Sequence, residues 1–300
     1  MFPESRMRRI ARELTGRRQL PRAQPVVPRN FEEQLYAAIV QPGDTCLDIG
    51  ANIGEVALFL ARLAGPEGTV CAFEPVWPVY RQLCRNLQFD TFLKAPVITV
   101  QCALSDRVGQ GTINLPGDDF GFGSLAPADN WRALKPDARV RSFRVDLDTL
   151  DGFLAAHPLA EPDFVKIDIE GAEGLLLAGA AGLLGAAKPP MLLMELFAPW
   201  QRAFGYGPWD VLSVLRHAGY EFLFACPQGL VPHAPTAAEP MPAAFVDGYN
   251  VIAYRPDLHA ARAQRLETFH ASRRPQLLPM GPPPQPNRVD APPAPPVESN

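Results

Sequence analysis

The feature that constrains the fold most is an alternation of short apolar runs with amphipathic stretches over residues 45–225. Residues 45–49 are apolar and end at Gly50, while residues 55–63 carry apolar side chains at helical spacing. The pattern repeats, with further strands expected at 69–73, 97–104, 164–169, 191–197 and 220–225 and helices at 78–87, 148–156, 172–184 and 209–218. Strands that alternate with helices predict an α/β fold with a mostly parallel sheet and helices on both faces.

Three further strands complete the expected architecture. Residues 249–254 follow strand 220–225 across a Pro-rich loop too short for a helical crossover, so this final pair should be antiparallel. The main sheet is then seven-stranded. Residues 111–115 alternate in polarity and suggest an extra antiparallel strand, with another strand at 142–147 and a loop between them.

Composition excludes several classes of protein. Of the 300 residues, 47% are hydrophobic and the formal net charge is −4, so the chain can bury a core and lacks the basic character of a nucleic-acid binder. No run of 18 apolar residues predicts a membrane span, and no apolar segment follows the basic N-terminus as in a secretory signal. The five cysteines form no CxxC pair, which favours reduced core thiols in a cytoplasmic protein.

The ends of the chain differ from its centre. Residues 1–30 hold eight Arg against two Glu and are expected to form a basic arm, either solvated or bound to an acidic surface. Residues 31–258 should form the α/β domain. Residues 259–300 contain a Pro-rich run from Pro275 to Pro296 and are expected to be a disordered tail.

The loop Asp48-Ile49-Gly50-Ala51-Asn52-Ile53-Gly54 follows the first strand, where an open parallel sheet binds its ligands. Gly50 permits a tight turn and a close ligand, and Asn52 tolerates left-handed backbone angles. The loop is not GxGxxG, and Asp48 and Glu55 flank it where a pyrophosphate would be repelled. A ligand with an amino group and a sulfonium suits these two carboxylates better.

Acidic residues end two strands. Glu74-Pro75 closes the second strand, where a carboxylate can accept hydrogen bonds from both ribose hydroxyls. Asp168 and Glu170 close the strand 164–169 and should share one side of the chain if it stays extended. Like charges with partial burial raise a carboxyl pKa, as a general base requires. Glu173 follows at a helix start, where it could equally be a structural cap.

The stretches LDIGANIGEVALFLA, VCAFEP and VKIDIEGAEG resemble the FkbM family of class I methyltransferases. The resemblance runs from about Gly43 to Glu195 and includes ALSD at 103–106 and DLDTLD at 146–151. It implies a Rossmann-like fold, S-adenosyl-L-methionine as cofactor, and methyl transfer to a hydroxyl oxygen of a sugar or natural product. No metal is expected.

The resemblance also implies roles for single residues. Cofactor contacts are expected at Asp48, Gly50, Ala51, Asn52 and Gly54 for the methionine part, at Glu74 and Pro75 for the ribose, at Ser105 and Asp106 near the adenine, and at Asp168. Asp168, Glu170 and Glu173 are the expected catalytic residues. Asp168 or Glu170 would orient or deprotonate a neutral hydroxyl acceptor, because methyl transfer mainly requires alignment of that oxygen.

Several alternatives stay open. His157 is a rival base, and a divalent metal could be held by carboxylates drawn from Asp146, Asp148, Asp151, Asp168 and Glu170. The loop 120–124 could be an acceptor lid or a plain surface loop, and the aromatic stretch 200–209 could shape the acceptor pocket or the core. Other functions compatible with the fold are a nicotinamide-dependent oxidoreductase and a non-catalytic cofactor-binding module. The identity of the acceptor and the oligomeric state are not predicted.

Overall fold

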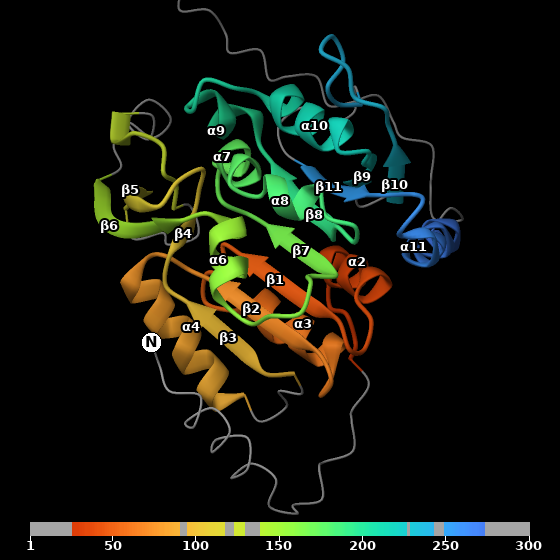
Figure 1. The fold of residues 1–300 in the computed structure, drawn as a ribbon, viewed down its shortest axis with the longest axis horizontal. Coiled ribbons are helices and arrows are strands. Elements are labelled where there is room, and N and C mark those ends of the chain that lie inside the picture. The colour runs from red at the N-terminus through yellow and green to blue at the C-terminus, as the bar shows by residue number, and fades with distance from the viewer. Residues whose placement is uncertain are drawn as a thin grey trace, which may run out of the picture.

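A computed structural model describes residues 26–90, 95–117, 123–129, 139–226, 229–242 and 249–273. Its centre is an eight-stranded sheet in the order β10-β9-β11-β8-β7-β1-β2-β3 (Figure 1). The strands are β1 (Thr45–Ile49), β2 (Thr69–Phe73), β3 (Val97–Val100), β7 (Phe164–Ile167), β8 (Met191–Leu196), β9 (Glu221–Cys226), β10 (Gly229–Pro232) and β11 (Tyr249–Tyr254).

The five strands from β3 to β8 in this order are parallel, whereas β11 lies antiparallel between β8 and β9. The expected mostly parallel sheet with an antiparallel end is therefore confirmed. The described sheet has eight strands rather than seven, because β10 returns from β9 as an antiparallel neighbour. Four residues of sequence Gly-Leu-Val-Pro have too little alternation to predict a strand on their own.

A second sheet lies beside the first, in the order β4-β6-β5. It contains β4 (Ala103–Leu104), β5 (Gly109–Pro116) and β6 (Val140–Asp148). The strands expected at 111–115 and 142–147 are both present, and they pair with each other antiparallel. The predicted single strand at 97–104 was wrong, because the chain leaves the main sheet after Val100 and pairs with β6 from Ala103 onward. A continuous apolar run contains no signal for such a change of partner.

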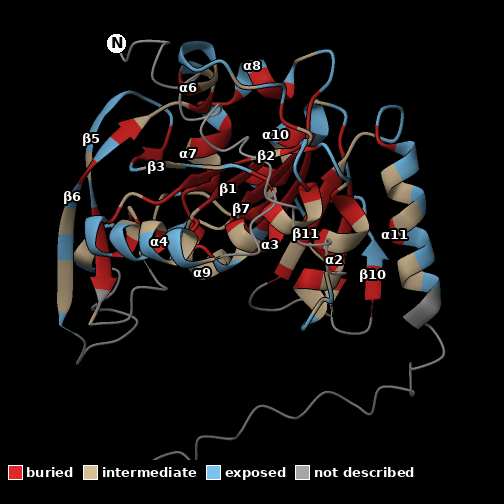
Figure 2. Ribbon diagram, turned by 90° about the horizontal axis from the view of Figure 1, so that it is seen from below, coloured by how far each residue is buried: buried red, intermediate tan, exposed pale blue. Residues whose placement is uncertain are grey.

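Helices cover both faces of the main sheet. They are α2 (Phe31–Ile39), α3 (Glu55–Ala64), α4 (Trp77–Phe89), α6 (Leu150–Ala156), α7 (Glu173–Ala178), α8 (Ala181–Leu184), α9 (Ala198–Arg202), α10 (Pro208–His217) and α11 (Ala260–Arg273). Alternate side chains of the strands pack against α6, α7, α8 and α10 on one face and against α2, α3 and α4 on the other. The strands are accordingly buried between helices with exposed outer surfaces (Figure 2).

The helix expected at 172–184 is interrupted at Gly179, which ends α7 two residues before α8 begins. A Cβ atom at Gly179 would lie 2.0 Å from the carbonyl oxygen of Ser105. The helix therefore breaks where the chain packs against the start of the second sheet. No helix among the described residues is long and apolar enough to cross a membrane.

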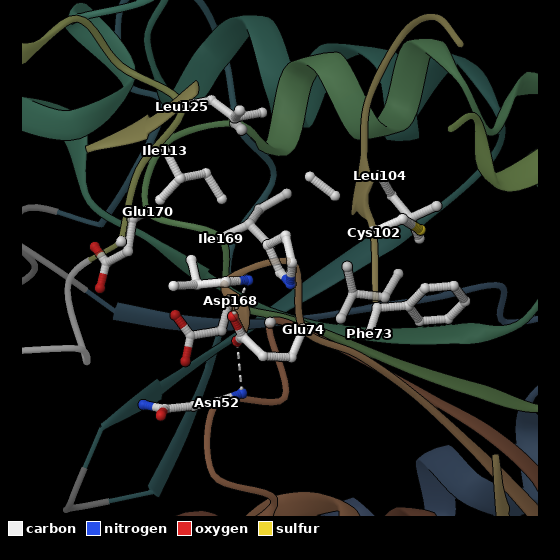
Figure 3. A pocket seen from close by; sticks show the side chains of 17 residues that line it. Asn52, Phe73, Glu74, Cys102, Leu104, Ile113, Leu125, Asp168, Ile169 and Glu170 are labelled. Atoms are coloured by element: carbon white, nitrogen blue, oxygen red, sulfur yellow. Dashed lines mark hydrogen bonds between the residues drawn. The ribbon is translucent and has the colours of Figure 1, made fainter. Parts of the chain in front are cut away.

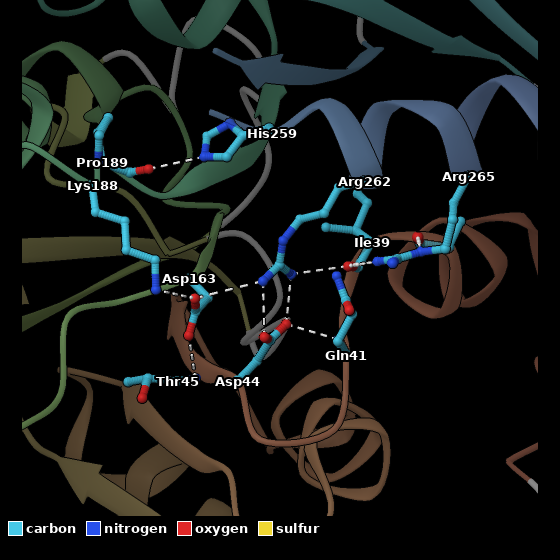
Figure 4. Close-up of polar contacts among 11 residues, drawn as sticks. Ile39, Gln41, Asp44, Thr45, Asp163, Lys188, Pro189, His259, Arg262 and Arg265 are labelled. Atoms are coloured by element: carbon cyan, nitrogen blue, oxygen red, sulfur yellow. Dashed lines mark hydrogen bonds and ion pairs between the residues drawn. The ribbon is translucent and has the colours of Figure 1, made fainter. Parts of the chain in front are cut away.

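Helix α11 occupies part of the segment that the sequence analysis assigned to a tail, and it packs against α2. Arg262 donates hydrogen bonds to both carboxylate oxygens of Asp44, at 2.6 and 2.8 Å, and to the carbonyl oxygen of Ile39 at 3.0 Å (Figure 4). Arg265 bonds the carbonyls of Ala38 and Ile39. These contacts connect α11 to the end of α2 and the start of β1. The expected arm and tail otherwise lie mainly outside the described residues.

Removing the Arg262 side chain should destabilise the fold, because Asp44 is only 6% exposed and would lose its cation. We expect Arg262→Ala to lower the free energy of unfolding by about 2–3 kcal/mol. Urea denaturation followed by circular dichroism measures this change. The matched control is Arg107→Ala, which removes an exposed ion pair with Asp106 and should cost less than about 1 kcal/mol. Equal effects of the two substitutions would contradict the inference that Arg262 of α11 stabilises the fold through Asp44.

Candidate active site

A pocket with a cavity volume of about 80 Å³ opens over the carboxyl ends of β1, β2 and β7 (Figure 3). Its floor comes from Ile49, Gly50 and Asn52, and one wall from residues 73–76 after β2. The acidic turn 168–170 forms the opposite wall. Residues 102–104 close one end, and Ile113, Gly123 and Leu125 of the second sheet and its loop cover the pocket.

The loop after β1 is held tightly against its neighbours. The backbone N–H groups of Gly50 and Ala51 donate to the carbonyl of Phe73 at 3.1 and 2.8 Å. Gly50 has a φ of +84°, and a Cβ there would lie 1.8 Å from the carbonyl oxygen of Asp168. Only glycine fits this approach between two strand ends. Asn52 is left-handed, with a φ of 47°, as its residue type allows.

Glu74 connects the first loop with the second. One carboxylate oxygen accepts from the backbone N–H of Asn52 at 3.1 Å, and the other accepts from that of Val76 at 2.8 Å. Burial raises the pKa of Glu74 to about 7, and these two hydrogen bonds oppose the shift. An ionised carboxylate has about four acceptor positions, so Glu74 retains capacity for hydroxyl donors inside the pocket.

A buried lysine lies between two carboxylates beneath the pocket. The ammonium of Lys166 is 3.0 Å from Asp168 and 3.8 Å from Asp48. Asp48 is fully buried, accepts no hydrogen bond from a described side chain, and has its pKa raised to about 6 by burial, against the effect of Lys166. Burial alone would lower the pKa of Lys166, but Asp168 and Asp48 together raise it. Lys166 was not among the predicted site residues. The sequence signal for it is a charged residue inside the apolar run Phe-Val-Lys-Ile.

The acidic turn lacks the extended backbone that was considered for residues 168–170. Strand β7 ends at Ile167, and Glu170 is left-handed with a φ of 52°, which costs a residue with a Cβ roughly 1–2 kcal/mol. The side chains of Asp168 and Glu170 nevertheless both line the pocket. Burial raises the pKa of Glu170 to about 9, and the nearby charges of Asp168, Glu195 and Glu173 add to the effect. Glu170 is therefore protonated at neutral pH.

Contacts from both flanks hold this turn. On the side of the second sheet, the hydroxyl of Ser124 donates a hydrogen bond of 2.6 Å to the carbonyl of Glu170. From the opposite side, the Tyr206 hydroxyl donates to the carbonyl of Gly171 at 2.5 Å and accepts from the N–H of Gly174 at 3.0 Å. A Cβ at Gly171 would lie 2.7 Å from the backbone of Trp200. The aromatic stretch 200–209 thus contributes to the support of the acidic turn.

Glu173 lies beside the pocket but does not line it. Its side chain is 1% exposed, and its two oxygens accept from the Gly171 N–H at 2.9 Å and from the Gln201 amide at 3.1 Å. Burial raises its pKa to about 7, while these hydrogen bonds oppose the shift. The contacts are those of a side chain that stabilises the turn.

Some of the residues predicted to contact the cofactor line the pocket, and others do not. Asp48, Ala51, Gly54, Ser105 and Asp106 do not line it, whereas Gly50, Asn52, Glu74, Pro75, Asp168 and Glu170 do. At the adenine end expected for Ser105 and Asp106, the lining residues are Cys102, Ala103 and Leu104 instead. The residues 120–122 of the expected lid are outside the described residues.

The carboxylates of the alternative metal site are used separately. Asp151 accepts two backbone N–H groups at the start of α8, and Asp148 accepts the N–H of Thr149. Within the described parts of the chain, no three His, Cys, Asp or Glu side chains are grouped as metal ligands. The rival base His157 bonds the carbonyl of Phe153 and does not line this pocket.

The parallel order β3-β2-β1-β7-β8 followed by an antiparallel β11, with a pocket over β1 and β2, defines the Rossmann-like fold of class I methyltransferases. The sequence model of the methyltransferase FkbM domain matches residues 48–222, which is more than half of the chain. The chain therefore belongs to the FkbM family of S-adenosylmethionine-dependent methyltransferases.

Two curated relatives and one solved structure illustrate the relationship. The chain is 29% identical to the AMB antimetabolite synthetase AmbE of Pseudomonas aeruginosa, over 64% of the chain and 10% of that protein. It is 30% identical to the 31-O-demethyl-FK506 methyltransferase FkbM of Streptomyces tacrolimicus, over 47% and 60% respectively. The crystal structure of methyltransferase FkbM from Methylobacillus flagellatus is 17% identical, with a TM-score of 0.43, over 74% and 50%. The alignments thus span only part of each of these relatives.

The raised pKa of Glu170 predicts a pH-dependent cost in stability. A carboxyl group that holds its proton more tightly in the folded state stabilises the fold at low pH, and this contribution is lost as pH rises toward 9. Relative to Glu170→Gln, the free energy of unfolding of the natural protein should fall by up to about 1.4 kcal/mol per pH unit between pH 5 and 9. Urea denaturation at several pH values measures the difference. Glu161→Gln, an exposed control, should show no such slope, and a flat difference for Glu170→Gln would contradict the assignment.

Proposed function

We propose that the protein transfers the methyl group of S-adenosyl-L-methionine to a hydroxyl oxygen of a small molecule, a sugar or another natural product. The observation that carries the proposal is a single pocket with Glu74 on one wall and the turn of Asp168 and Glu170 on the other. The first wall suits a ribose and the second suits a hydroxyl that must be aligned and lose a proton.

The residues present fit the cofactor. Gly50 leaves the backbone of the first loop open to a ligand, because no Cβ can occupy the space beside the Asp168 carbonyl. The buried Asp48 carboxylate, which lacks a hydrogen-bond donor among the described side chains, adds negative charge beneath this loop. Glu74 would accept from the ribose hydroxyls. When bound, S-adenosyl-L-methionine supplies a methyl group activated by the positive sulfonium.

Asp168 and Glu170 would act on the acceptor. The carboxyl group of Asp168 is about one-third exposed, and its hydrogen bond from Lys166 fixes its position. It is therefore suited to orient an acceptor hydroxyl. Glu170 must lose its own proton before it can take one from the acceptor. Glu173 would support both through the turn, since its oxygens are already bonded to Gly171 and Gln201.

The relatives guide the choice of acceptor class. One is named as a methyltransferase of 31-O-demethyl-FK506, and the other as an antimetabolite synthetase. Hydroxylated secondary metabolites are therefore the first acceptors to try with this chain. A nicotinamide-dependent oxidoreductase fits less well, because a dinucleotide needs a pyrophosphate site and the first loop is preceded by Asp48 and followed by Glu55.

The cofactor part of the proposal predicts specific binding. Calorimetric titration with S-adenosylhomocysteine should give a dissociation constant in the micromolar range, and Glu74→Gln should weaken binding at least about tenfold, because one strong acceptor is lost. Glu67→Gln, in an exposed turn, is the matched control and should bind like the natural protein. Binding of NADH in place of S-adenosylhomocysteine would favour the oxidoreductase.

The acceptor part predicts a separation of turnover from binding. Hydroxylated natural products and sugars are incubated with methyl-labelled S-adenosylmethionine, and the best acceptor is used for kinetics. Asp168→Asn should lower turnover at least about 100-fold, whereas the dissociation constant of S-adenosylhomocysteine should change less than about threefold. Full turnover by this variant would refute a role for Asp168 at the acceptor. Cofactor binding without transfer to any acceptor would favour a non-catalytic module.

A further inference from the structure

A polar network whose central residues, Asn114 and Ser124, are buried crosses from the second sheet to the acidic turn. The hydroxyl of Ser142 on β6 donates to the amide oxygen of Asn114 on β5 at 2.7 Å, and the amide nitrogen of Asn114 donates to the carbonyl of Ala126 at 2.8 Å. Asn114 and Ser124 also pair through their backbones, at 2.8 and 3.1 Å. The segment 123–126 is therefore fixed to β5 by three hydrogen bonds next to the pocket.

Ser124 is the last member of this network. Its side chain is fully buried, accepts from the N–H of Ala126 at 3.2 Å, and donates its proton to the carbonyl of Glu170 at 2.6 Å. These two residues are 46 positions apart in sequence. Of the four hydrogen bonds described for Ser124, only the one from its hydroxyl to the Glu170 carbonyl leaves the second sheet and reaches the turn after β7.

The contact acts at a strained residue. Glu170 has a left-handed φ of 52°, a conformation that is unfavourable for glutamate, and its half-buried carboxyl group lines the pocket, where it is partly removed from water. Both costs favour a relaxed turn with Glu170 directed to solvent. One well-formed hydrogen bond is of the same magnitude as the backbone cost, so the Ser124 hydroxyl can offset that cost, in addition to the support that Tyr206 gives the turn from the other side.

We propose that Ser124 is a positioning residue, whose hydroxyl holds the Glu170 carbonyl and so keeps the Glu170 carboxyl group in the pocket. Its importance for catalysis rests on the proposed function. The placement of Glu170 can be measured without any turnover. A failure of the positioning role is therefore distinguishable from a failure of the proposed function.

The first experiment follows the titration of Glu170 by carbon NMR of protein labelled at the glutamate carboxyl groups. The resonance of Glu170 is assigned by its absence in Glu170→Gln. In the natural protein it should titrate near pH 9, and in Ser124→Ala at least about one pH unit lower, because the released carboxyl group reaches water. An unchanged titration in Ser124→Ala would overturn the proposal.

Two further variants keep this test decisive. Ser142→Ala removes another hydroxyl of the same network without touching Glu170, and its titration should stay within about 0.3 pH units of the natural value. An equal shift in Ser142→Ala would indicate a general loosening of the second sheet and would overturn a specific role for Ser124. If Ser124→Ala does not fold, Ser124→Cys replaces the strong donor with a weak one of similar size and should show the same shift.

The second experiment applies once an acceptor is known. Ser124→Ala should lower turnover at least about tenfold and leave the dissociation constant of S-adenosylhomocysteine within about threefold. If Ser124 acts through Glu170, it should have no further effect in a Glu170→Gln background, where the two turnover numbers should agree within about twofold. A full additional tenfold loss in that background would contradict the proposed coupling.

Discussion

The site depends on the parallel pairing of β1 with β7, which brings together residues more than a hundred positions apart. The pairing places Asp48 beside Lys166 in register and continues beyond the strands, where the Asp168 N–H donates to the carbonyl of Ile49 at 3.0 Å. Gly50 can then lie against the Asp168 carbonyl only because it has no Cβ. The loop after β1 and the acidic turn therefore pack directly against each other, so a change in the backbone of either is expected to shift the other.

Beneath the pocket, one buried cation organises several carboxylates. Lys166 bonds Asp168 directly and attracts Asp48, and its charge also opposes the raised pKa of Glu170. A buried ion pair is costly to break, because either partner left alone in a low-dielectric site loses its compensation. Lys166 therefore fixes Asp168 at the pocket through a direct ion pair, and its positive charge only partly offsets the raised pKa of Glu170.

The sequence predicted those parts of the protein that depend on local pattern. The runs of β1 and β2, the Gly50 loop and Glu74 follow from apolar segments and from residue types at strand ends, and all were found in place. The change of sheet after Val100 and the contact of Ser124 with Glu170 depend on long-range packing, which leaves no local signal. The extended form expected for residues 168–170 failed for a similar reason, since tertiary contacts stabilise a backbone angle that glutamate alone would avoid.

The strained turn at Glu170 is supported from two sides, and the second sheet carries one of these supports. The register of β7 with β1 ends at Ile167, and one further hydrogen bond, from the Asp168 N–H to the Ile49 carbonyl, reaches the start of the turn. Beyond Asp168, the turn is held on one flank by Ser124 and on the other by Tyr206, which belong to segments before and after it in sequence. Each flank is anchored separately, one in the antiparallel pair β5–β6 and the other next to α10, whose first residue is Pro208. A carboxyl group with an unfavourable backbone angle and an unfavourable environment can be kept in a pocket only by support of this kind, and the stability lost at the turn must come from the packing of both flanks.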